Sequence, residues 1–325
     1  MKSVWYGVVS ALVFVSLVPG AGLAKKPAPQ PKDLMLRALK LTDIRAKGSP
    51  PFQLQGNVTI FHTRQGKIAG TYSLIWRSPN KWRETMSFPG YTQVRLLDGN
   101  KMWRQRSSPT IPLQAFEMED ALNYGYWLMA LSGQKPQQVE SRKKKGIRQW
   151  CSNHWATALC FDPVSEVLLS YANISTTTEL SDYESWGNKL FPRNIMVFIG
   201  KRCIAGFKAV RLSSLSQPGI GTFSPPAGAT ESLGCQDPEP PKRLSGSEPR
   251  YPLLAKEDFI TGTVRVIAEI GVDGKVHDAN VEDSPGKILS APALKALQNW
   301  TYQPASCQGK PVPLETEIDV DFSTQ

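Results

Sequence analysis

The sequence predicts an α+β protein: a large antiparallel sheet followed by a small sheet-and-helix unit at the C-terminal end. Apolar residues recur at every second position through much of residues 52–214, which is the period of a half-buried strand. Turn signals such as Pro89-Gly90 and Asp98-Gly99 interrupt this pattern about every ten to twelve residues. Helical periodicity is confined to short segments. We therefore expect an N-terminal curved antiparallel sheet or open barrel with inserted helices, followed by an α-β-β-α-β unit.

The first 24 residues have the features of a secretory signal peptide. Lys2 precedes an apolar run of 14 residues, 5–18, and the small residues Gly22 and Ala24 follow it. We expect cleavage after Ala24 and export to the periplasm. The alternative is an uncleaved inner-membrane anchor, although a spanning helix needs about 20 apolar residues.

The rest of the chain divides into four expected segments. Residues 25–32 form a Pro-rich leader, and residues 33–216 form the β-rich domain. Residues 217–248 are rich in Pro, Gly and Ser, which is typical of a linker, and residues 249–325 form the last domain. A length of 325 residues with 41% hydrophobic side chains suits about two domains with real cores.

Within the first domain, we expect a helix over residues 33–46 and a first strand from Phe52, interrupted by a bulge or close packing at Gly56. A meander of strands follows, and then a second helix over residues 115–132 that ends at Gly133. Later strands are expected at about 147–151, 158–162, 166–173, 193–200 and 205–214.

The last domain opens with a short helix after Tyr251-Pro252. Two strands, 263–271 and 276–282, flank a turn at Asp273-Gly274, which is a strong hairpin signal. A helix over residues 291–300 and a closing strand over residues 313–322 complete the order α-β-β-α-β.

All five cysteines follow the signal segment, and an exported chain can keep disulfides. Cys151 and Cys160 flank a hairpin-length segment, so a disulfide is favoured there over a metal site that would include His154. Cys203 and Cys235 form the second expected bridge, which leaves Cys307 free.

The formal net charge of +10 is divided unevenly along the chain. Residues 249–325 hold 7 Lys/Arg and 11 Asp/Glu, a balance of −4, and the remainder holds 31 and 17, a balance of +14. The basic part suits an acidic envelope surface, whereas nucleic acid is a poor partner for an exported chain. The densest run, residues 142–145, is interpreted as a solvated loop between strands.

The residues do not provide a catalytic set. The three histidines, His62, His154 and His277, are not accompanied by a nucleophile and an orienting group in a recognisable pattern. We therefore expect a binding protein that is not an enzyme and has no cofactor and no metal.

The last domain resembles the C-terminal domain of TonB-family periplasmic proteins. The motifs that carry this resemblance follow one another in the family's order: Tyr251-Pro252, Gly262-Thr263-Val264, Asp273-Gly274-Lys275-Val276, Ser284-Pro285-Gly286, Ala293-Leu294, the run Trp300 to Ala305, Gly309 to Val312 and Phe322. The resemblance implies a small domain that adds an extended peptide, such as a segment of an outer-membrane receptor, to the edge of its sheet.

Carried over to this chain, the resemblance implies a pairing strand at its end, supported by two further residues. The implied peptide-binding residues are Tyr251, Arg265, Val312, Leu314, Thr316, Ile318, Val320 and Phe322. The same edge could pair with a second copy of the chain. Two positions depart from the energy transducers of the family: the N-terminal apolar segment has no His, and Lys256 stands where Gln is frequent.

The first domain resembles the LolA-like lipoprotein-carrier fold. The resemblance rests on the opening helix, on residues 76–83 with their Trp, Pro and Arg, on residues 97–103 and on Phe161-Asp162-Pro163. It implies a curved sheet closed by helices over an acyl-chain cavity. The candidate cavity residues are Trp76, Trp82, Trp103 and Trp127.

These observations predict a periplasmic, non-enzymatic binding protein. Its last domain would dock a peptide or an outer-membrane transport partner, and its first domain would bind lipid or the envelope. The alternatives are a lipid or lipoprotein carrier and, with an uncleaved anchor, an energy transducer for outer-membrane receptors.

Overall fold

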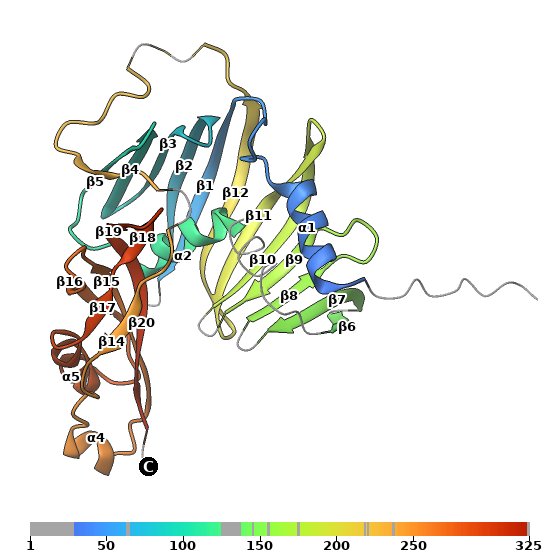
Figure 1. Cartoon of the computed structure of the whole chain (residues 1–325). Helices are drawn as coiled ribbons and strands as arrows, with labels where there is room; N and C mark the ends of the chain where they lie inside the picture. The colour runs from blue at the N-terminus through green and yellow to red at the C-terminus, as the bar shows by residue number, and fades with distance from the viewer. Residues whose placement is uncertain are drawn as a thin grey trace, which may run out of the picture.

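The computed structural model describes residues 29–62, 66–124, 138–144, 146–154, 157–173, 176–217, 219, 221–235 and 238–323. The expected signal peptide and most of the Pro-rich leader lie outside these residues. Among the described residues, no helix has both the length and the apolar character that crossing a membrane requires. A large curved antiparallel sheet carries α1 and α2 on one face, and a smaller group of strands and helices lies beside β5 and α2 (Figure 1).

The large sheet contains thirteen strands in the order β13-β5-β4-β3-β2-β1-β12-β11-β10-β9-β8-β7-β6. Most neighbours in this order are consecutive in the chain, which is the expected meander. β1 and β12 join its two halves. The strands are β1 (Phe52–His62), β2 (Gly66–Ser78), β3 (Lys81–Phe88), β4 (Tyr91–Asp98), β5 (Lys101–Arg106), β6 (Val139–Lys144), β7 (Ile147–His154), β8 (Thr157–Phe161), β9 (Leu168–Ala172), β10 (Thr177–Trp186), β11 (Lys189–Ile199), β12 (Arg202–Ser214) and β13 (Thr230–Leu233).

Gly56 occupies the position where the sequence predicts a bulge or close packing. The β1–β12 register shifts between Gln55 and Gly56, and a Cβ atom on Gly56 would lie 2.1 Å from the Phe207 ring. A side chain here would displace Phe207 from the core, so only glycine fits.

The two helices of this part cover two separate cores on one face of the sheet. α1 (Pro31–Thr42) packs Leu34, Met35 and Ala38 against β7 to β10. α2 (Leu113–Leu122) packs against β1 to β4, β11 and β12. α1 ends four residues before the expected boundary at residue 46, and residues 125–137, which include Trp127 and much of the expected second helix, lie outside the described residues.

Two strands depart from the sequence interpretation. The basic run expected in a loop instead contributes Arg142, Lys143 and Lys144 to β6, which ends the sheet. Charged side chains suit an edge strand because they oppose further pairing. β10 (Thr177–Trp186) was not predicted because buried Thr178 replaces an apolar residue in its alternation.

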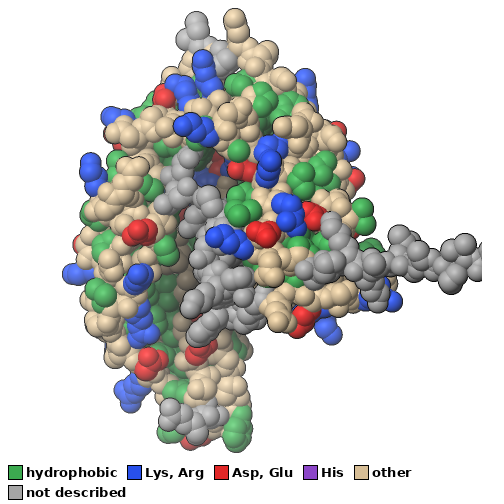
Figure 2. All heavy atoms as spheres, turned by 45° about the vertical axis from the view of Figure 1, so that its right-hand side comes forward, with side chains coloured by type: hydrophobic (Ala, Val, Ile, Leu, Met, Phe, Trp, Pro, Cys, Tyr) green, Lys and Arg blue, Asp and Glu red, His purple; other side chains and the backbone are tan. Residues whose placement is uncertain are grey.

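On the face in Figure 2, Lys and Arg side chains are spread over the surface of the molecule.

The expected linker, residues 217–248, is folded onto both parts of the protein. β13 pairs with β5, and β14 (Lys242–Ser245) pairs with β17 (Thr301–Gln303). Arg83 and Gln105 donate hydrogen bonds to the carbonyls of Thr222 and Ala227, at 3.3 and 2.8 Å. Backbone pairing and side-chain contacts thus connect the described residues of this segment to both parts of the protein.

The C-terminal unit, defined here as residues 249–323, has the expected order of helices and strands. Its sheet has the order β16-β15-β20, with β15 in the centre. Three short strands are added between the second helix and the closing strand. The elements are α4 (Leu253–Glu257), β15 (Gly262–Ile270), β16 (Val276–Asp283), α5 (Lys287–Leu297), β17 (Thr301–Gln303), β18 (Ala305–Cys307), β19 (Lys310–Val312) and β20 (Leu314–Phe322).

Disulfides join Cys151 to Cys160 and Cys235 to Cys307, while Cys203 is free. The first bridge crosses the β7–β8 hairpin as expected. The expected Cys203–Cys235 bridge is wrong. Cys203 lies on β12, in the middle of the large sheet, whereas Cys235 directly follows β13 at the edge of the sheet, next to β18 with Cys307.

Candidate functional site at the edge of the C-terminal sheet

β20 forms one edge of the C-terminal sheet. It pairs with β15 over nine positions, from Leu314 opposite Ile270 to Phe322 opposite Gly262. Within the part of the chain that the structure describes, no strand is hydrogen-bonded along the other side of β20. The backbone N–H and C=O groups on that side can form hydrogen bonds with a second extended chain, which would extend the sheet by one strand.

The helix-facing side of β20 belongs to the core of the C-terminal unit. Ile318, Val320 and Phe322 are buried among residues of β15 and α5. Tyr251 packs edge-to-face on Phe322, with ring centroids 5.5 Å apart, and its hydroxyl donates to the Ile260 carbonyl at 2.8 Å. These predicted binding residues therefore fix the strand in place, and a partner could use the backbone of β20 without displacing them.

The remaining predicted residues lie along the same strand and its approach. Leu314 and Thr316 are half-buried, and Val312 is buried at the end of β19. Arg265 points to the opposite face of the sheet, where its Nε atom lies 3.0 Å from Glu317 and 3.5 Å from Asp319. Glu317 and Asp319 lie on the acidic face of β20, and Arg265 neutralises part of its charge by pairing with both.

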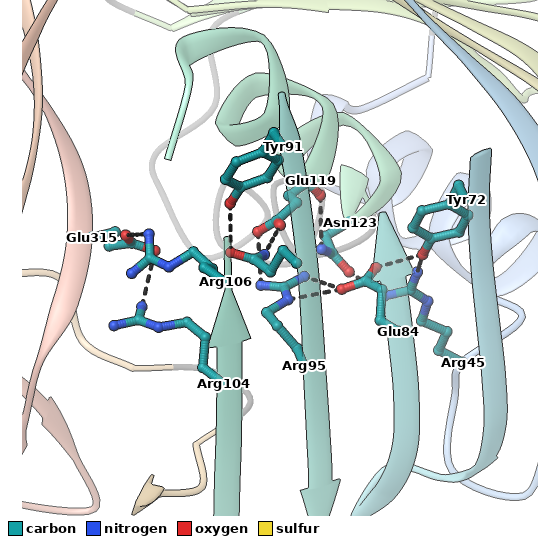
Figure 3. A network of polar contacts seen from close by, with 11 residues as sticks. Arg45, Tyr72, Glu84, Tyr91, Arg95, Arg104, Arg106, Glu119, Asn123 and Glu315 are labelled. Carbon is teal, nitrogen blue, oxygen red and sulfur yellow. Dashed lines mark hydrogen bonds and ion pairs between the residues drawn. The ribbon is translucent and has the colours of Figure 1, made fainter. Parts of the chain in front are cut away.

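That acidic face lies against the N-terminal sheet. Arg104 of β5 contacts Glu269 of β15 at 2.6 Å and Glu315 of β20 at 3.0 Å. Arg106, two residues further along β5, also pairs with Glu315 (Figure 3). The backbone N–H of Leu113, at the start of α2, donates to Glu282 of β16 at 2.9 Å. All three strands of the C-terminal sheet therefore contact the N-terminal part.

One apolar side chain crosses the same junction. Ile267 of β15 is 1% exposed and belongs to the core formed by β1 to β4 and α2. Its neighbours Val266 and Ala268 belong instead to the core of the C-terminal unit. The alternation along β15 thus links two hydrophobic cores.

Behind the junction, the polar network continues into the large sheet. Arg95 of β4 pairs with Glu84 of β3 and with Glu119 of α2, the latter at 3.0 Å (Figure 3). Burial raises the pKa of Glu119 to about 7, against the charge of Arg95 and with support from the charges of Glu84 and Glu315. Burial also opposes ionisation of Glu84, but Arg95 and Arg45 outweigh it and hold the pKa of Glu84 below its usual value.

A second carboxyl of α2 faces the C-terminal sheet directly. Burial, a hydrogen bond with Glu317 and the charge of Glu317 raise the pKa of Glu117 well above its usual value. The Thr176 hydroxyl donates to Glu117 at 3.0 Å and opposes the shift. The raised pKa means that Glu117 keeps its proton more readily than an ordinary carboxyl, which favours its hydrogen bond with Glu317 and the contact between α2 and β20.

The proposed cavity tryptophans do not form one lining. Trp76 is 1% exposed and stacks on Phe52 at a centroid distance of 5.3 Å. Trp82 is paired with Trp76 across β2 and β3, so both point toward the helices. Trp103 is paired with Leu96, the neighbour of the residue opposite Trp82, so it points to the other face. Trp127 lies outside the described residues.

The described residues contain no group of three or more His, Cys, Asp or Glu side chains arranged to hold a metal ion. His277 contacts Asp273 at 3.0 Å on the exposed hairpin. None of the junction residues Arg104, Arg106 and Glu117, nor Glu119 behind them, was predicted from the sequence. The signal available was the alternation of acids along β20, which indicates a charged face but does not identify what covers it.

Residues 247–324 match the family model described as Gram-negative bacterial TonB protein C-terminal. Protein TonB of Klebsiella pneumoniae is 31% identical over 75 residues, which are 23% of this chain and 29% of that protein. The chain thus aligns with less than a third of the length of this relative.

Solved structures similar to the chain include a LolA superfamily protein from Nitrosomonas europaea, with a TM-score of 0.41 and 10% identity over 61% of this chain and 98% of that chain. A putative outer membrane lipoprotein-sorting protein domain from Vibrio parahaemolyticus has a TM-score of 0.39 and 9% identity, over 58% of this chain and 94% of that chain. The family match over residues 247–324 confirms what the motif order of the sequence predicted: the C-terminal unit is similar to the TonB C-terminal family.

Proposed function

We propose that this is a periplasmic binding protein of the cell envelope whose β20 edge docks an extended peptide segment of an envelope partner. The observation that supports this most directly is the position of β20. It is a nine-residue edge strand, within a unit that matches the TonB C-terminal family, and its side chains are already held by the core and by Arg265. The free backbone edge is therefore the part of the strand that remains for a partner.

The division into domains at residues 216 and 249 belongs to this proposal. The N-terminal domain presents the C-terminal sheet by holding its acidic face through Arg104 and Arg106. The partner is an envelope protein, such as an outer-membrane receptor, that exposes a short strand-forming segment. Pairing with a second copy of the chain would occupy the same edge.

Proline substitutions in two neighbouring positions test strand addition. Successive residues of a strand direct their N–H groups to opposite sides, so one of Thr316 and Glu317 faces β15 and the other faces the open edge. We expect one of Thr316→Pro and Glu317→Pro to lower the Tm below that of its matched alanine variant, because it breaks the β15 ladder, and the other to keep the Tm of its alanine variant but abolish docking.

The probe is a peptide selected from a displayed random library against the full chain. Hydrogen exchange should show protection of amides within residues 314–322 when this peptide binds. Thr316→Ala and Glu317→Ala control for the side chains and should retain binding. Peptide binding that persists in both proline variants, or protection confined to another element, would reject strand addition at β20.

An acyl-chain carrier is the alternative role for the N-terminal domain, and its predicted lining has less support. Trp76 is packed in the core and Trp103 points away from Trp82, so these residues do not surround one space. Native mass spectrometry of gently purified protein tests the role directly. A stoichiometric bound lipid would restore the carrier hypothesis, and its consistent absence would remove it.

A further inference from the structure

A groove lies on the C-terminal unit, on the side of α5 that does not cover the sheet. It has a volume of about 540 Å³ and runs between α5 and the segment that leads into α4. This volume falls within the usual range of about 300 to 1,000 Å³ for ligand sites. The lining residues are Ser247, Glu248, Arg250, Pro252, Leu253, Ala291, Pro292, Lys295, Ala296 and Asn299. In Figure 1, α4 lies at the end of the C-terminal unit farthest from the large sheet.

The groove is held in shape by Trp300, at the end of α5. The Trp300 indole N–H donates to the Ser247 carbonyl at 2.8 Å, and the Arg243 guanidinium lies 3.5 Å from the centre of the Trp300 ring. Gly246 fits against the same ring, because a Cβ atom there would lie 2.2 Å from it. One wall, residues 247–253, is therefore fixed to the helix that forms the other wall, so little ordering is needed on binding.

The groove is apolar and accessible. Pro252 and Leu253 form one side and Ala291, Pro292 and Ala296 the other, and Leu253 is 70% exposed. Small side chains on α5 allow the backbone of a partner to approach closely. Leu253 therefore adds a large, exposed apolar side chain to the small apolar side chains of the groove.

Two cations lie at the rim of the groove. Within the part of the chain that the structure describes, neither Arg250 nor Lys295 has a carboxylate within ion-pair distance. The one acidic lining residue, Glu248, is paired with Arg243 at 3.5 Å. The C-terminal unit is acidic overall, with 7 basic and 11 acidic residues over 249–325, and much of that negative charge faces the N-terminal sheet. The groove is thus a locally basic site on an acidic unit.

We propose that this groove docks a protein segment in which an apolar side chain is flanked by Asp or Glu. The apolar side chain enters between Leu253 and Ala296, and the neighbouring carboxylate pairs with Arg250 and Lys295. An acidic segment is repelled by the rest of the unit and attracted here, so charge complementarity selects both the site and the partner. This surface is separate from the β20 edge, and it goes beyond the proposed strand addition.

The test starts from a displayed random peptide library. Peptides are selected on the full chain after depletion on Arg250→Glu/Lys295→Glu, which retains the β20 edge but reverses the rim charges. Both residues are exposed, so the fold should be unaffected, and circular dichroism and Tm check this. The expected result is enrichment of peptides with an apolar residue next to Asp or Glu.

Affinity of a selected peptide is then measured by fluorescence anisotropy against three variants. Arg250→Glu/Lys295→Glu and the groove-filling Ala291→Trp should each weaken binding at least about tenfold, which is the size expected for lost charge pairs and a blocked apolar contact. The matched control Lys275→Glu/Lys310→Glu makes the same charge change on exposed lysines outside the groove and should stay within about twofold.

Three outcomes overturn the proposal. The first is that no peptide dependent on the groove remains after depletion, and the second is that the selected peptides bind the groove and control variants equally. The third is that phosphatidylglycerol vesicles bind the full chain and lose binding in Arg250→Glu/Lys295→Glu, which would assign the surface to an anionic membrane. The proline variant that keeps its Tm alters the β20 edge, and Arg250→Glu/Lys295→Glu alters the groove rim, so failure here and failure of strand addition are separate results.

Discussion

One face of the C-terminal sheet is covered by α4 and α5, and the other lies against the N-terminal sheet. The helix-covered face is built from Val264, Val266, Ile270 and their partners on β20 and α5, all apolar and buried. The junction face instead uses Glu269, Glu315 and Glu317 against arginines, with Ile267 as its apolar contact.

The difference shows how one small sheet can be both a folded unit and a docked one. Burial of apolar side chains does not depend on protonation and is not weakened by charge screening, whereas half-buried ion pairs weaken with salt and with changes of protonation. We therefore expect the C-terminal unit to fold under all mild conditions and its attachment to the N-terminal sheet to depend on them. The experiments below are arranged to break these two contacts separately.

The largest effect is expected from a charge on the helix-covered face. Val266 is fully buried, so Val266→Asp should prevent folding of the C-terminal unit at a cost above about 4 kcal/mol. Hydrogen exchange should then show loss of protection in residues 262–322 and retention in β1 to β12. Val272→Asp, at an exposed position of the same unit, is the control and should leave protection unchanged. Simultaneous loss of both sheets would mean that the two parts fold as one.

The disulfide between Cys235 and Cys307 should have the next largest effect. Cys235 follows β13 at the edge of the large sheet, so the bridge fastens the C-terminal unit to that edge across 72 residues of chain. Closing a loop of this length contributes about 4 kcal/mol in the chain-entropy model, and the nine-residue Cys151–Cys160 loop about 2.5 kcal/mol.

We expect Cys235→Ser/Cys307→Ser to lower the denaturation midpoint more than Cys151→Ser/Cys160→Ser. The free thiol variant Cys203→Ser controls for cysteine replacement alone. Equal losses from the two bridges would show that the long-range one does not constrain the junction.

A smaller coupling is expected between Arg104 and Glu315, whose side chains are 29% and 16% exposed. A double-mutant cycle with Arg104→Ala and Glu315→Ala should give about 1 to 3 kcal/mol, because the pair is partly desolvated. The matched pair Lys101 and Glu231, on β5 and β13, is 54% and 49% exposed and should give below about 1 kcal/mol. If both cycles give the same coupling, the junction pair has no special role.

Much of the fold could be predicted from local patterns. The helix at α1, the β1–β5 meander, the bulge at Gly56 and the α-β-β-α-β order follow from periodicity and turn residues. β6 and β10 were missed because charged and hydroxyl side chains occupy positions where the alternation test expects apolar ones. A local pattern describes one strand at a time, whereas β6 and β10 are strands because they form backbone hydrogen bonds with neighbouring strands of the sheet.

The junction could not be predicted from the sequence. Its residues come from β5, α2, β15 and β20, and only the folded chain brings Arg104 within 3.0 Å of Glu315. The cysteine pairing failed for a related reason. Cys235 reaches Cys307 because β13 pairs with β5, and the Pro-rich segment gave no sign of that strand. Both the junction and the Cys235–Cys307 disulfide depend on contacts between residues that are far apart in the chain.

The last effect at the junction, which is absent at low pH, is the pH dependence of Glu117. Its pKa is raised in the folded protein, so it favours folding below the unfolded value near 4.5, and this contribution is lost as pH rises toward the folded value. Glu117→Gln keeps the shape and a hydrogen-bonding side chain but does not titrate. The variant should therefore match the natural protein near pH 4.5 and become increasingly more stable than it as the pH rises above that value.

Denaturant unfolding at several pH values measures this divergence, with the exposed Glu231→Gln as control. Glu119, whose pKa is about 7, gives a pH dependence of the same sign in both proteins, so only the difference between them reports Glu117. Parallel stability curves would mean that Glu117 is solvated and that no proton is shared with Glu317. The same comparison is then made in a Glu317→Gln background, between the single variant and the double variant with Glu117→Gln. If their stability curves no longer diverge with pH, the titrating contact lies between α2 and β20, on the charged face and not in the apolar core.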